Sequence, residues 1–301
     1  MPEKDRPPVC DYEGSDYQTR FWETGGRDYE DRCEAIALKR LLPRSGKLML
    51  ELGAGAGRNT LRYQGFERVV LLDYSMTQLK QAQERLGNSE RYTYVAADIY
   101  RLPFVKNLFD ATTMIRTLHH MADAPAALQQ VRSVLQPGAT FILEYANKRN
   151  LKAILRYAFR QQSWSPYCTD PIEFAPLNFD FHPWAIRGWL KEMDFREEKT
   201  LAVSYLRIEL LKRIIPAGVL AGLDSLLQWT GGWRPYSPSV FMKLKLEGVP
   251  TGSLPANPKE FFKCPECKTF PLMDEGDQLV CPGCRRAWNI KDGIFDFRGS
   301  E

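Results

Sequence analysis

The chain has 301 residues, of which 44% are hydrophobic, 26% charged and 12% aromatic, a composition that supports a folded core and excludes disorder over most of the length. Its 41 basic and 37 acidic residues give a net charge of +4, which is too balanced to indicate nucleic-acid binding by itself. The longest apolar run, Ile214 to Leu223, is too short for a bilayer span, and the first residues lack an apolar stretch typical of a secretory signal. We therefore expect a cytoplasmic protein.

Short apolar strands alternate with helical stretches through the first half of the chain. Helices are expected at residues 30–42, 76–86 and 124–135, with a further helical stretch after a glycine-rich turn near residue 57. Strands are expected at residues 47–52, 68–72, 92–96, 111–115 and 140–145, and again at 199–205 and 240–246. This alternation predicts an α/β fold with a doubly wound, mostly parallel, seven-stranded sheet of the Rossmann-like type.

The composition changes outside this pattern. Residues 1–30 are predicted to form an arm that packs on the domain or partly covers a site. Residues 31–247 would form the main domain, with inserts at 147–182 and 206–236. Residues 248–258, rich in Gly, Pro and small polar residues, read as a linker to a separate small unit at 259–301.

The first strand runs into a glycine-rich turn, Glu51-Leu52-Gly53-Ala54-Gly55-Ala56-Gly57. Glycines allow the backbone to approach a ligand closely and to adopt positive φ. The dinucleotide-binding pattern requires a glycine where this chain has Arg58. Because an acid beside the turn would repel a pyrophosphate, the motif favours a ligand that carries a positive charge, such as an amino-acid-bearing nucleoside.

Two further acids follow the next strands. Asp73 ends the second strand, 20 residues after Gly53, which is the spacing at which a carboxylate binds ribose hydroxyls. Asp98 follows the third strand, in a place that suits an adenine amino group. Taken singly, such residues are more often turn or cap residues. The ordered set of carboxylates instead indicates a ligand at the carboxyl edge of the sheet.

On these motifs, residues 45–145 resemble the class I S-adenosylmethionine-dependent methyltransferases, in the group that includes the ubiquinone/menaquinone-biosynthesis methyltransferases. The segments that carry the resemblance are 51–57, 71–75, 98–104, 109–120 and 135–138. The resemblance implies that Glu51 holds the methionine ammonium, Asp73 the ribose and Asp98 the adenine amine. It also implies a set of cofactor-binding neighbours: Gly53, Gly55, Gly57, Tyr74, Ile99, Arg116 and Leu118.

A general base is needed only if the methyl acceptor keeps its proton at neutral pH. His119 and His120 follow the fourth strand and are the candidate catalytic residues, although either could instead pack beside the cofactor or cap a helix. His182 precedes Pro183 and a predicted helix, so a cap or a pocket wall is the favoured interpretation there.

Four cysteines stand near the end of the chain in two C-x-x-C pairs, Cys264/Cys267 and Cys281/Cys284. This spacing favours a closed structural zinc site, with a redox dithiol, disulfides or an iron site as alternatives. The segments 279–284 and 288–294 resemble the small zinc-ribbon protein that activates several methyltransferases. Residues 259–301 carry seven basic and eight acidic residues, so we expect a stabilising or lid role more than RNA contact through Lys263, Lys268, Arg285 and Arg286.

The two inserts bear on the acceptor. Lys148, Lys152, Arg156 and Arg160 recur every four residues beside apolar positions, which is typical of a solvated helix face or of a surface for an anionic acceptor, a membrane or RNA. Residues 206–229 are unusually apolar and would form a pocket wall or pack on a neighbouring chain. The function predicted is methyl transfer from S-adenosylmethionine to an apolar or aromatic small molecule. An RNA methyltransferase and a non-catalytic scaffold are the alternatives.

Overall fold

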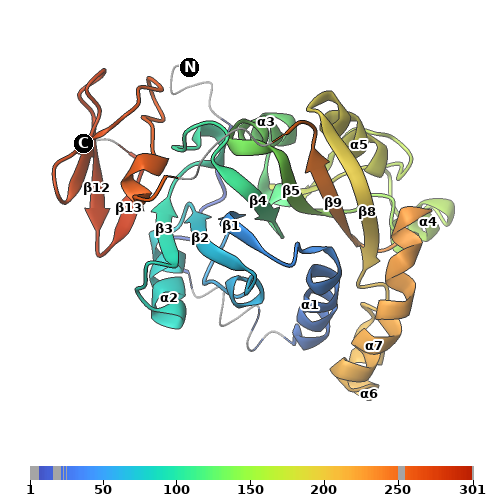
Figure 1. Cartoon of the computed structure of the whole chain (residues 1–301). Helices are drawn as coiled ribbons and strands as arrows, with labels where there is room; N and C mark the ends of the chain where they lie inside the picture. Colours follow the sequence, from blue (N-terminus) through green and yellow to red (C-terminus); the bar gives the residue numbers. More distant parts are fainter. Residues whose placement is uncertain (1–6, 16–21, 23, 25, 250–254, 300–301) are drawn as a thin grey trace.

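The structure, a computed structural model, describes residues 7–15, 22, 24, 26–249 and 255–299 (Figure 1). The helices are α1 (Asp28–Leu41), α2 (Met76–Leu86), α3 (Ala124–Val134), α4 (Leu151–Ala158), α5 (Pro183–Glu192), α6 (Glu209–Ile214) and α7 (Ala217–Leu227). The short 3-10 helices within these described ranges are η3 (Thr60–Arg62), η4 (Ile99–Arg101), η5 (Leu118–His120), η6 (Gln228–Gly232) and η7 (Pro258–Phe261). None of the helices in these ranges is long and apolar enough to cross a membrane.

The strands of the first 250 residues are β1 (Gly46–Leu52), β2 (Phe66–Asp73), β3 (Tyr92–Ala96), β4 (Phe109–Met114), β5 (Leu135–Ala146), β6 (Ile172–Ala175), β7 (Asn178–Asp180), β8 (Phe195–Val203) and β9 (Ser239–Leu246). Those of the C-terminal part are β10 (Met273–Asp274), β11 (Gln278–Val280), β12 (Ala287–Lys291) and β13 (Ile294–Asp296).

A single sheet organises the molecule. Its strand order is β10-β11-β12-β13-β3-β2-β1-β4-β5-β9-β8. Strands β3, β2, β1, β4 and β5 are parallel, whereas β9 lies antiparallel between β5 and β8. The predicted mostly parallel doubly wound sheet is confirmed, and each of the seven predicted strands has its counterpart in β1–β5, β8 and β9. Among the described residues the C-terminal strands β10–β13 extend this sheet to eleven strands, more than the seven predicted.

The sequence suggested a separate C-terminal unit, but in the structure the C-terminal segment continues the sheet of the main domain. β13 pairs in parallel with β3, and Ile294 lies opposite Tyr94 (Figure 1). Phe262 and Phe297 are buried and stack in one aromatic cluster. Since β3 would otherwise be the edge of a parallel sheet with unpaired backbone groups, the pairing covers both its hydrogen bonds and its apolar face.

The local structure follows from the sequence in most places. The strands at the centre of the sheet are nearly continuous apolar runs because both faces are covered by other elements. Ser75 and Asp123 cap α2 and α3 with their side chains. One difference occurs after the glycine-rich turn, where the helical stretch is a single 3-10 turn, η3, because the chain enters β2 only four residues later.

The two inserts lie at the end of the sheet away from the C-terminal strands (Figure 1). Residues 147–182 contain α4 and the two-stranded sheet β6-β7, and residues 206–236 contain α6, α7 and η6. α7 packs on α1 through Leu220 and Ala221, which are fully buried. The last residues before β9 contact α4, since the Leu151 amide donates to the Tyr236 carbonyl at 2.8 Å.

Candidate active site and metal centre

A cavity lies where the strands β1, β2, β3 and β4 end, and loops from the N-terminus cover it. The predicted cofactor residues that line it are Gly53, Gly55, Asp73, Tyr74, Asp98, Ile99 and Arg116, together with His120 of the predicted catalytic pair. Four other predicted residues, Glu51, Gly57, Leu118 and His119, are not part of the lining. The carboxyl edge of the sheet thus gathers most of the predicted set into one place.

Glycines shape the floor of this cavity. Gly53 has φ of +67°, and a Cβ there would lie 2.1 Å from the Thr117 hydroxyl oxygen. Gly55 has φ of +52°, and its amide donates to an Asp73 carboxylate oxygen at 2.8 Å. Both positions therefore need glycine, the first for space and backbone and the second for backbone conformation.

The Asp73 carboxylate is held rigidly at the end of β2. One oxygen accepts from the Gly55 amide and the other accepts from the Ser75 amide at 2.9 Å. Burial raises the pKa of Asp73 from its ordinary value, while these backbone hydrogen bonds oppose that rise. The carboxylate keeps lone pairs directed at the cavity and is suited to accept from the vicinal hydroxyls of a ribose.

Asp98 is the second buried carboxylate of the cavity. It caps η4, accepting from the Tyr100 amide at 2.8 Å, and its other oxygen accepts from Arg101 Nε at 3.3 Å. The same guanidinium forms an ion pair with Glu266, which stands inside the first C-x-x-C pair. Asp98, Arg101 and Glu266 therefore connect the cavity to the C-terminal segment.

Glu51 lies behind the glycine-rich turn. Its two oxygens accept from the Thr60 hydroxyl at 2.5 Å and from the Tyr63 hydroxyl at 3.2 Å. Burial raises the pKa of Glu51 to about 7, opposed by these two hydrogen bonds and by the charges of Arg58 and Arg62. Its role toward an ammonium group stays a prediction, and in this structure the side chain anchors η3 beneath the turn.

Arginines at the rim of the cavity are tied to α1. Arg58 pairs with Glu34 at 2.7 Å, and Arg116 pairs with the same fully buried carboxylate. The charges of Arg116 and Arg58 are the main causes that keep the pKa of Glu34 below its ordinary value despite burial. The Arg58 guanidinium also stacks 3.5 Å from the ring centre of Trp22. This network fixes the side of the cavity that adjoins α1.

The two candidate catalytic histidines differ in their surroundings. His120 lies in the cavity wall, where Nε2 is 3.2 Å from the Tyr12 hydroxyl and Nδ1 is 2.9 Å from the Leu177 carbonyl oxygen. His119 packs against His120 with ring centres 4.0 Å apart. Burial lowers the pKa of both rings, and neighbouring cationic groups lower that of His119 further. Both rings are therefore neutral near pH 7 and able to accept a proton.

Sequence reasoning missed Asp180, which ends β7. This strand contacts both η5, which carries the histidines, and β5. Burial, with a smaller contribution from the Glu144 charge, raises the pKa of Asp180 to about 6. The available signal was an isolated acid among aromatic residues, Phe179 and Phe181. His182, by contrast, accepts from the Trp184 amide at 3.2 Å, so the predicted cap is confirmed.

The N-terminal arm forms part of the cavity wall. Within the described residues of the predicted 1–30 arm, Val9, Cys10 and Tyr12 line the cavity. Glu13 accepts from the Met76 and Thr77 amides at the start of α2, and Arg298 donates to Glu13 at 3.0 Å. The described part of the arm thus lies against the cavity, while residues 1–6, 16–21, 23 and 25 of the predicted 1–30 arm lie outside the described residues. Its contact with the C-terminal segment had no sequence signal.

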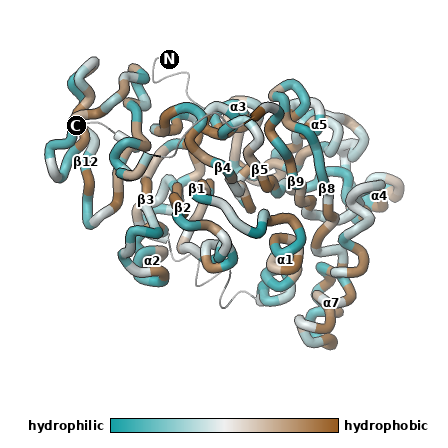
Figure 2. Tube along the Cα trace, viewed as in Figure 1, coloured by the Kyte–Doolittle hydropathy of each residue, from teal (hydrophilic) through white to brown (hydrophobic). Residues whose placement is uncertain are grey.

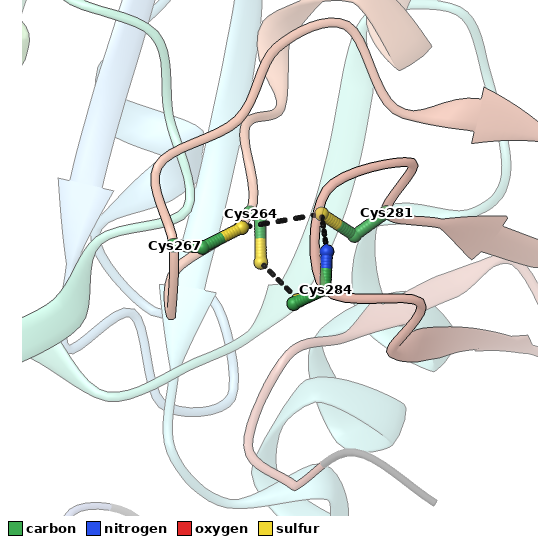
Figure 3. Close-up of side chains that lie close together, drawn as sticks. All are labelled: Cys264, Cys267, Cys281 and Cys284. Carbon is green, nitrogen blue, oxygen red and sulfur yellow. Dashed lines mark hydrogen bonds between the residues drawn. The ribbon is translucent and has the colours of Figure 1, made fainter.

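The four C-terminal cysteines converge on one point (Figure 3). Their sulfur atoms lie within 4.8 Å of one another, with Cys267–Cys281 at 3.3 Å and Cys264–Cys284 at 3.6 Å. All four are free thiols in the structure. Thiolates around a tetrahedral zinc ion at about 2.3 Å stand about 3.8 Å apart, so this donor set fits a four-coordinate structural zinc ion. The four cysteines predicted as metal ligands therefore lie close enough together to bind one ion.

Comparisons with known protein families match both parts of the chain. The methyltransferase domain model matches residues 50–143, and the Trm112p-like protein model matches residues 260–293. The first match contains Asp73 and Asp98, and the second contains all four cysteines.

Two curated relatives each match part of this chain. The 2-phytyl-1,4-naphtoquinone methyltransferase of Nostoc punctiforme is 35% identical over 127 residues, which are 38% of this chain and 54% of that protein. The demethylmenaquinone methyltransferase of Thermobifida fusca is 33% identical over 102 residues, 33% of this chain and 43% of that protein. The chain therefore spans about half the length of these relatives or less.

Solved structures support the fold. A complex of the Haloferax volcanii Trm112 methyltransferase activator with a putative methyltransferase matches with a TM-score of 0.52 at 18% identity, covering 75% of this chain and 96% of that one. A putative S-adenosylmethionine-dependent methyltransferase from Listeria monocytogenes matches with a TM-score of 0.54 at 15% identity, covering 73% and 99%. The chain therefore contains a methyltransferase domain followed, in the same polypeptide, by a Trm112p-like domain with a zinc-type cysteine cluster.

Proposed function

We propose that this protein transfers the methyl group of S-adenosylmethionine to an apolar or aromatic small molecule. The observation that carries the proposal is the pair of carboxylates, Asp73 and Asp98, at the ends of adjacent strands beside a turn in which Gly53 and Gly55 have positive φ. The quinone-type names of the relatives support an aromatic, lipid-like acceptor.

The cavity residues have separate binding tasks in this proposal. Asp73 accepts from the ribose hydroxyls and Asp98 accepts from the adenine amino group, while Ile99 packs against the base. Arg116, whose backbone amide donates to Glu144 at 2.9 Å, forms the border on the side of the reacting groups. Bound S-adenosylmethionine supplies an electrophilic methyl group on its sulfonium. The remaining work of the protein is to align the acceptor and to exclude water.

His120 is the candidate proton acceptor that lines the cavity, whereas His119 and Asp180 are not part of the lining. His120 lies in the wall itself and is neutral near pH 7, and its Nδ1 is held by the Leu177 carbonyl. A neutral ring held in this way donates from Nδ1 and accepts a proton at Nε2, the atom now facing Tyr12. An acceptor hydroxyl that displaces the Tyr12 hydroxyl would meet this nitrogen. His119 lies outside the wall and supports His120 by packing.

The test is binding followed by labelled transfer. Calorimetry on the purified protein is expected to show one site for S-adenosylmethionine and for its demethylated product. The protein is then incubated with methyl-labelled donor and a lysate fractionated into lipid, small-molecule, RNA and protein pools. Label in the organic-extractable pool supports the proposal. Label in RNA or protein contradicts the acceptor class, and no binding of either nucleoside contradicts the whole function.

A further inference from the structure

Apolar side chains gather on the outside of the two inserts. On α4, Leu151, Leu155 and the adjoining Phe159 recur every four residues and are about half to 71% exposed. On α7, Val219, Leu223 and Leu226 form the face opposite to the one that packs on α1. Leu210, Ile214 and Trp233 continue the exposed apolar area at either end of α7, with Trp233 84% exposed. We call this area the α4–α7 surface.

These side chains occupy one end of the molecule. α4 and the chain that follows α7 are joined by the hydrogen bond from the Leu151 amide to the Tyr236 carbonyl. Figure 1 shows α4, α6 and α7 together on the side of the sheet away from the C-terminal strands, and Figure 2 shows apolar residues recurring along α7. Exposed apolar side chains that gather on helices at one end of a molecule favour an interaction surface over scattered surface residues.

Basic residues outnumber acidic ones in the segments that form this surface. The exposed cations are Lys152, Arg156, Arg160, Arg213 and Arg234, and none of them pairs with a carboxylate among the described residues. Residues 147–169 contain no acid, and residues 210–246 contain only Asp224. Asp224 is fully buried and accepts from the Ser204 and Tyr205 amides. The exposed acids next to these segments are Glu209, which pairs with Lys212, Asp28, which pairs with Arg32, and Asp170.

This combination discriminates between occupants. A second copy of the chain, related by a two-fold axis, would bring the cationic surface against itself. An RNA partner bound by base stacking would pack on aromatic side chains, whereas Leu, Ile and Val outnumber Phe159 and Trp233 on this surface. An anionic bilayer offers both an apolar interior for the aliphatic side chains and negative headgroups for the basic residues beside them.

We propose that the α4–α7 surface docks the protein on an anionic lipid bilayer, with the aliphatic side chains of α4, α6 and α7 inserted at the headgroup boundary. The inference stands on exposure and charge and does not depend on the cofactor assignment. If the proposed function also holds, docking would bring the protein to the phase in which a lipid-like acceptor dissolves.

The experiment is vesicle flotation with the full-length protein. Phosphatidylcholine vesicles that contain phosphatidylglycerol are expected to carry the protein, and vesicles of phosphatidylcholine alone are expected to carry about tenfold less. Raising the salt concentration should release the protein, because screening weakens attraction to the headgroups.

Two sets of variants separate the apolar and ionic contributions. Phe159→Ser with Leu226→Ser and Trp233→Ser removes exposed apolar groups, and the matched control is Phe270→Ser with Met273→Ser, exposed apolar residues of the C-terminal domain. Lys152→Glu with Arg156→Glu and Arg160→Glu reverses three charges, and Arg44→Glu with Lys47→Glu, also exposed, is its control. Both test sets should lower the vesicle-bound fraction about tenfold or more; both controls should leave it unchanged.

Three results would overturn the proposal. One is a wild-type protein that does not float with anionic vesicles. Another is a dimer in sedimentation analysis that the apolar variant converts to a monomer, with no vesicle binding, which would assign the surface to self-association. The third is loss of RNA binding, but not of vesicle binding, in the charge variant. Titration with S-adenosylmethionine in the same samples reports separately on the cofactor site.

Discussion

At the scale of single residues, the carboxylates at the sheet edge differ in what they do for the fold. Asp73 has both oxygens engaged by backbone amides yet lines the cavity, whereas Glu51 has both oxygens engaged by hydroxyl groups and does not line it. Substitutions at these two positions therefore have different expected effects, one on ligand binding and one on stability.

Asp73→Asn should weaken binding of S-adenosylmethionine by about tenfold to a hundredfold, because an amide keeps the size of the side chain but accepts fewer hydrogen bonds from the ribose. Calorimetric titration measures the change. Asp277→Asn, an exposed position in the C-terminal domain, is the control and should bind as the wild type does. Equal affinities for all three proteins would contradict the role of Asp73.

Glu51 gives a prediction for stability against pH. In the unfolded chain it ionises near 4.5, whereas burial raises its pKa in the folded protein to about 7. Between these values the folded chain keeps a proton that the unfolded chain has lost, so this group makes the free energy of unfolding fall as pH rises from 4.5 to about 7. Glu51→Gln should remove that decline and raise the free energy of unfolding near pH 8 by up to about 3 kcal/mol.

Urea denaturation from about pH 5 to about pH 8 tests this expectation. Glu67→Gln, on the exposed surface of β2, should follow the wild-type profile. A Glu51→Gln profile parallel to that of the wild type would show that Glu51 does not titrate in this range. The same variant tests the predicted ammonium contact, since weaker donor binding would support it and unchanged binding would leave Glu51 as an anchor of η3.

At the scale of elements, the C-terminal domain reaches the cavity by two routes. The first C-x-x-C pair is connected to η4 through the Glu266–Arg101 ion pair, and Arg101 contacts Asp98. The chain after β13 is connected to the N-terminal arm through Arg298 and Glu13. Each route ends on an element of the cavity wall. We therefore expect the C-terminal domain to help hold the wall in place.

Glu266→Gln should weaken binding of S-adenosylmethionine by about threefold to tenfold, because Arg101 keeps only Asp98 of its two carboxylate partners and is held less firmly against it. The metal content should stay unchanged, since Glu266 is not one of the four cysteine ligands. Arg286→Gln is the matched control: it removes the other ion pair of Glu266, at 3.3 Å, without touching Arg101. If Glu266→Gln binds S-adenosylmethionine as the wild type does, the Glu266–Arg101 ion pair does not affect cofactor binding.

Element positions were largely predictable from the sequence, whereas long-range contacts were not. Alternating apolar runs locate β1 to β5, and the spacing of Asp73 and Asp98 places both carboxylates at one edge. The contact between Glu13 and Arg298 joins residues 285 positions apart and depends on the way β13 is placed beside β3. No periodicity encodes such a contact. The linker-like composition of residues 248–258 likewise suggested two independent domains, whereas the pairing of β13 with β3 joins them in one sheet.

At the scale of the whole molecule, one sheet passes through both domains. Phe262 stacks on Phe104 of the main domain, with ring centres 5.7 Å apart, and Trp288 is buried against Phe297. The small domain therefore shares its core with the large one. We expect loss of the metal to destabilise both domains.

Cys281→Ser should abolish binding of the metal and lower the thermal midpoint of the entire protein by about 10 °C, because the segment that pairs with β3 loses its support. Metal analysis and calorimetric unfolding provide the two measurements. Cys168→Ser replaces an exposed cysteine outside the cluster and should change neither. If the thermal midpoint of the large domain is the same in the wild type and in Cys281→Ser, the two domains unfold independently.

The pairing of β13 with β3 also determines how this protein can assemble. A separate chain could not pair with this edge of β3, because β13 of the same protein already occupies its hydrogen-bonding groups. Because the two domains belong to one polypeptide, their association does not weaken on dilution, and they are present in a one-to-one ratio.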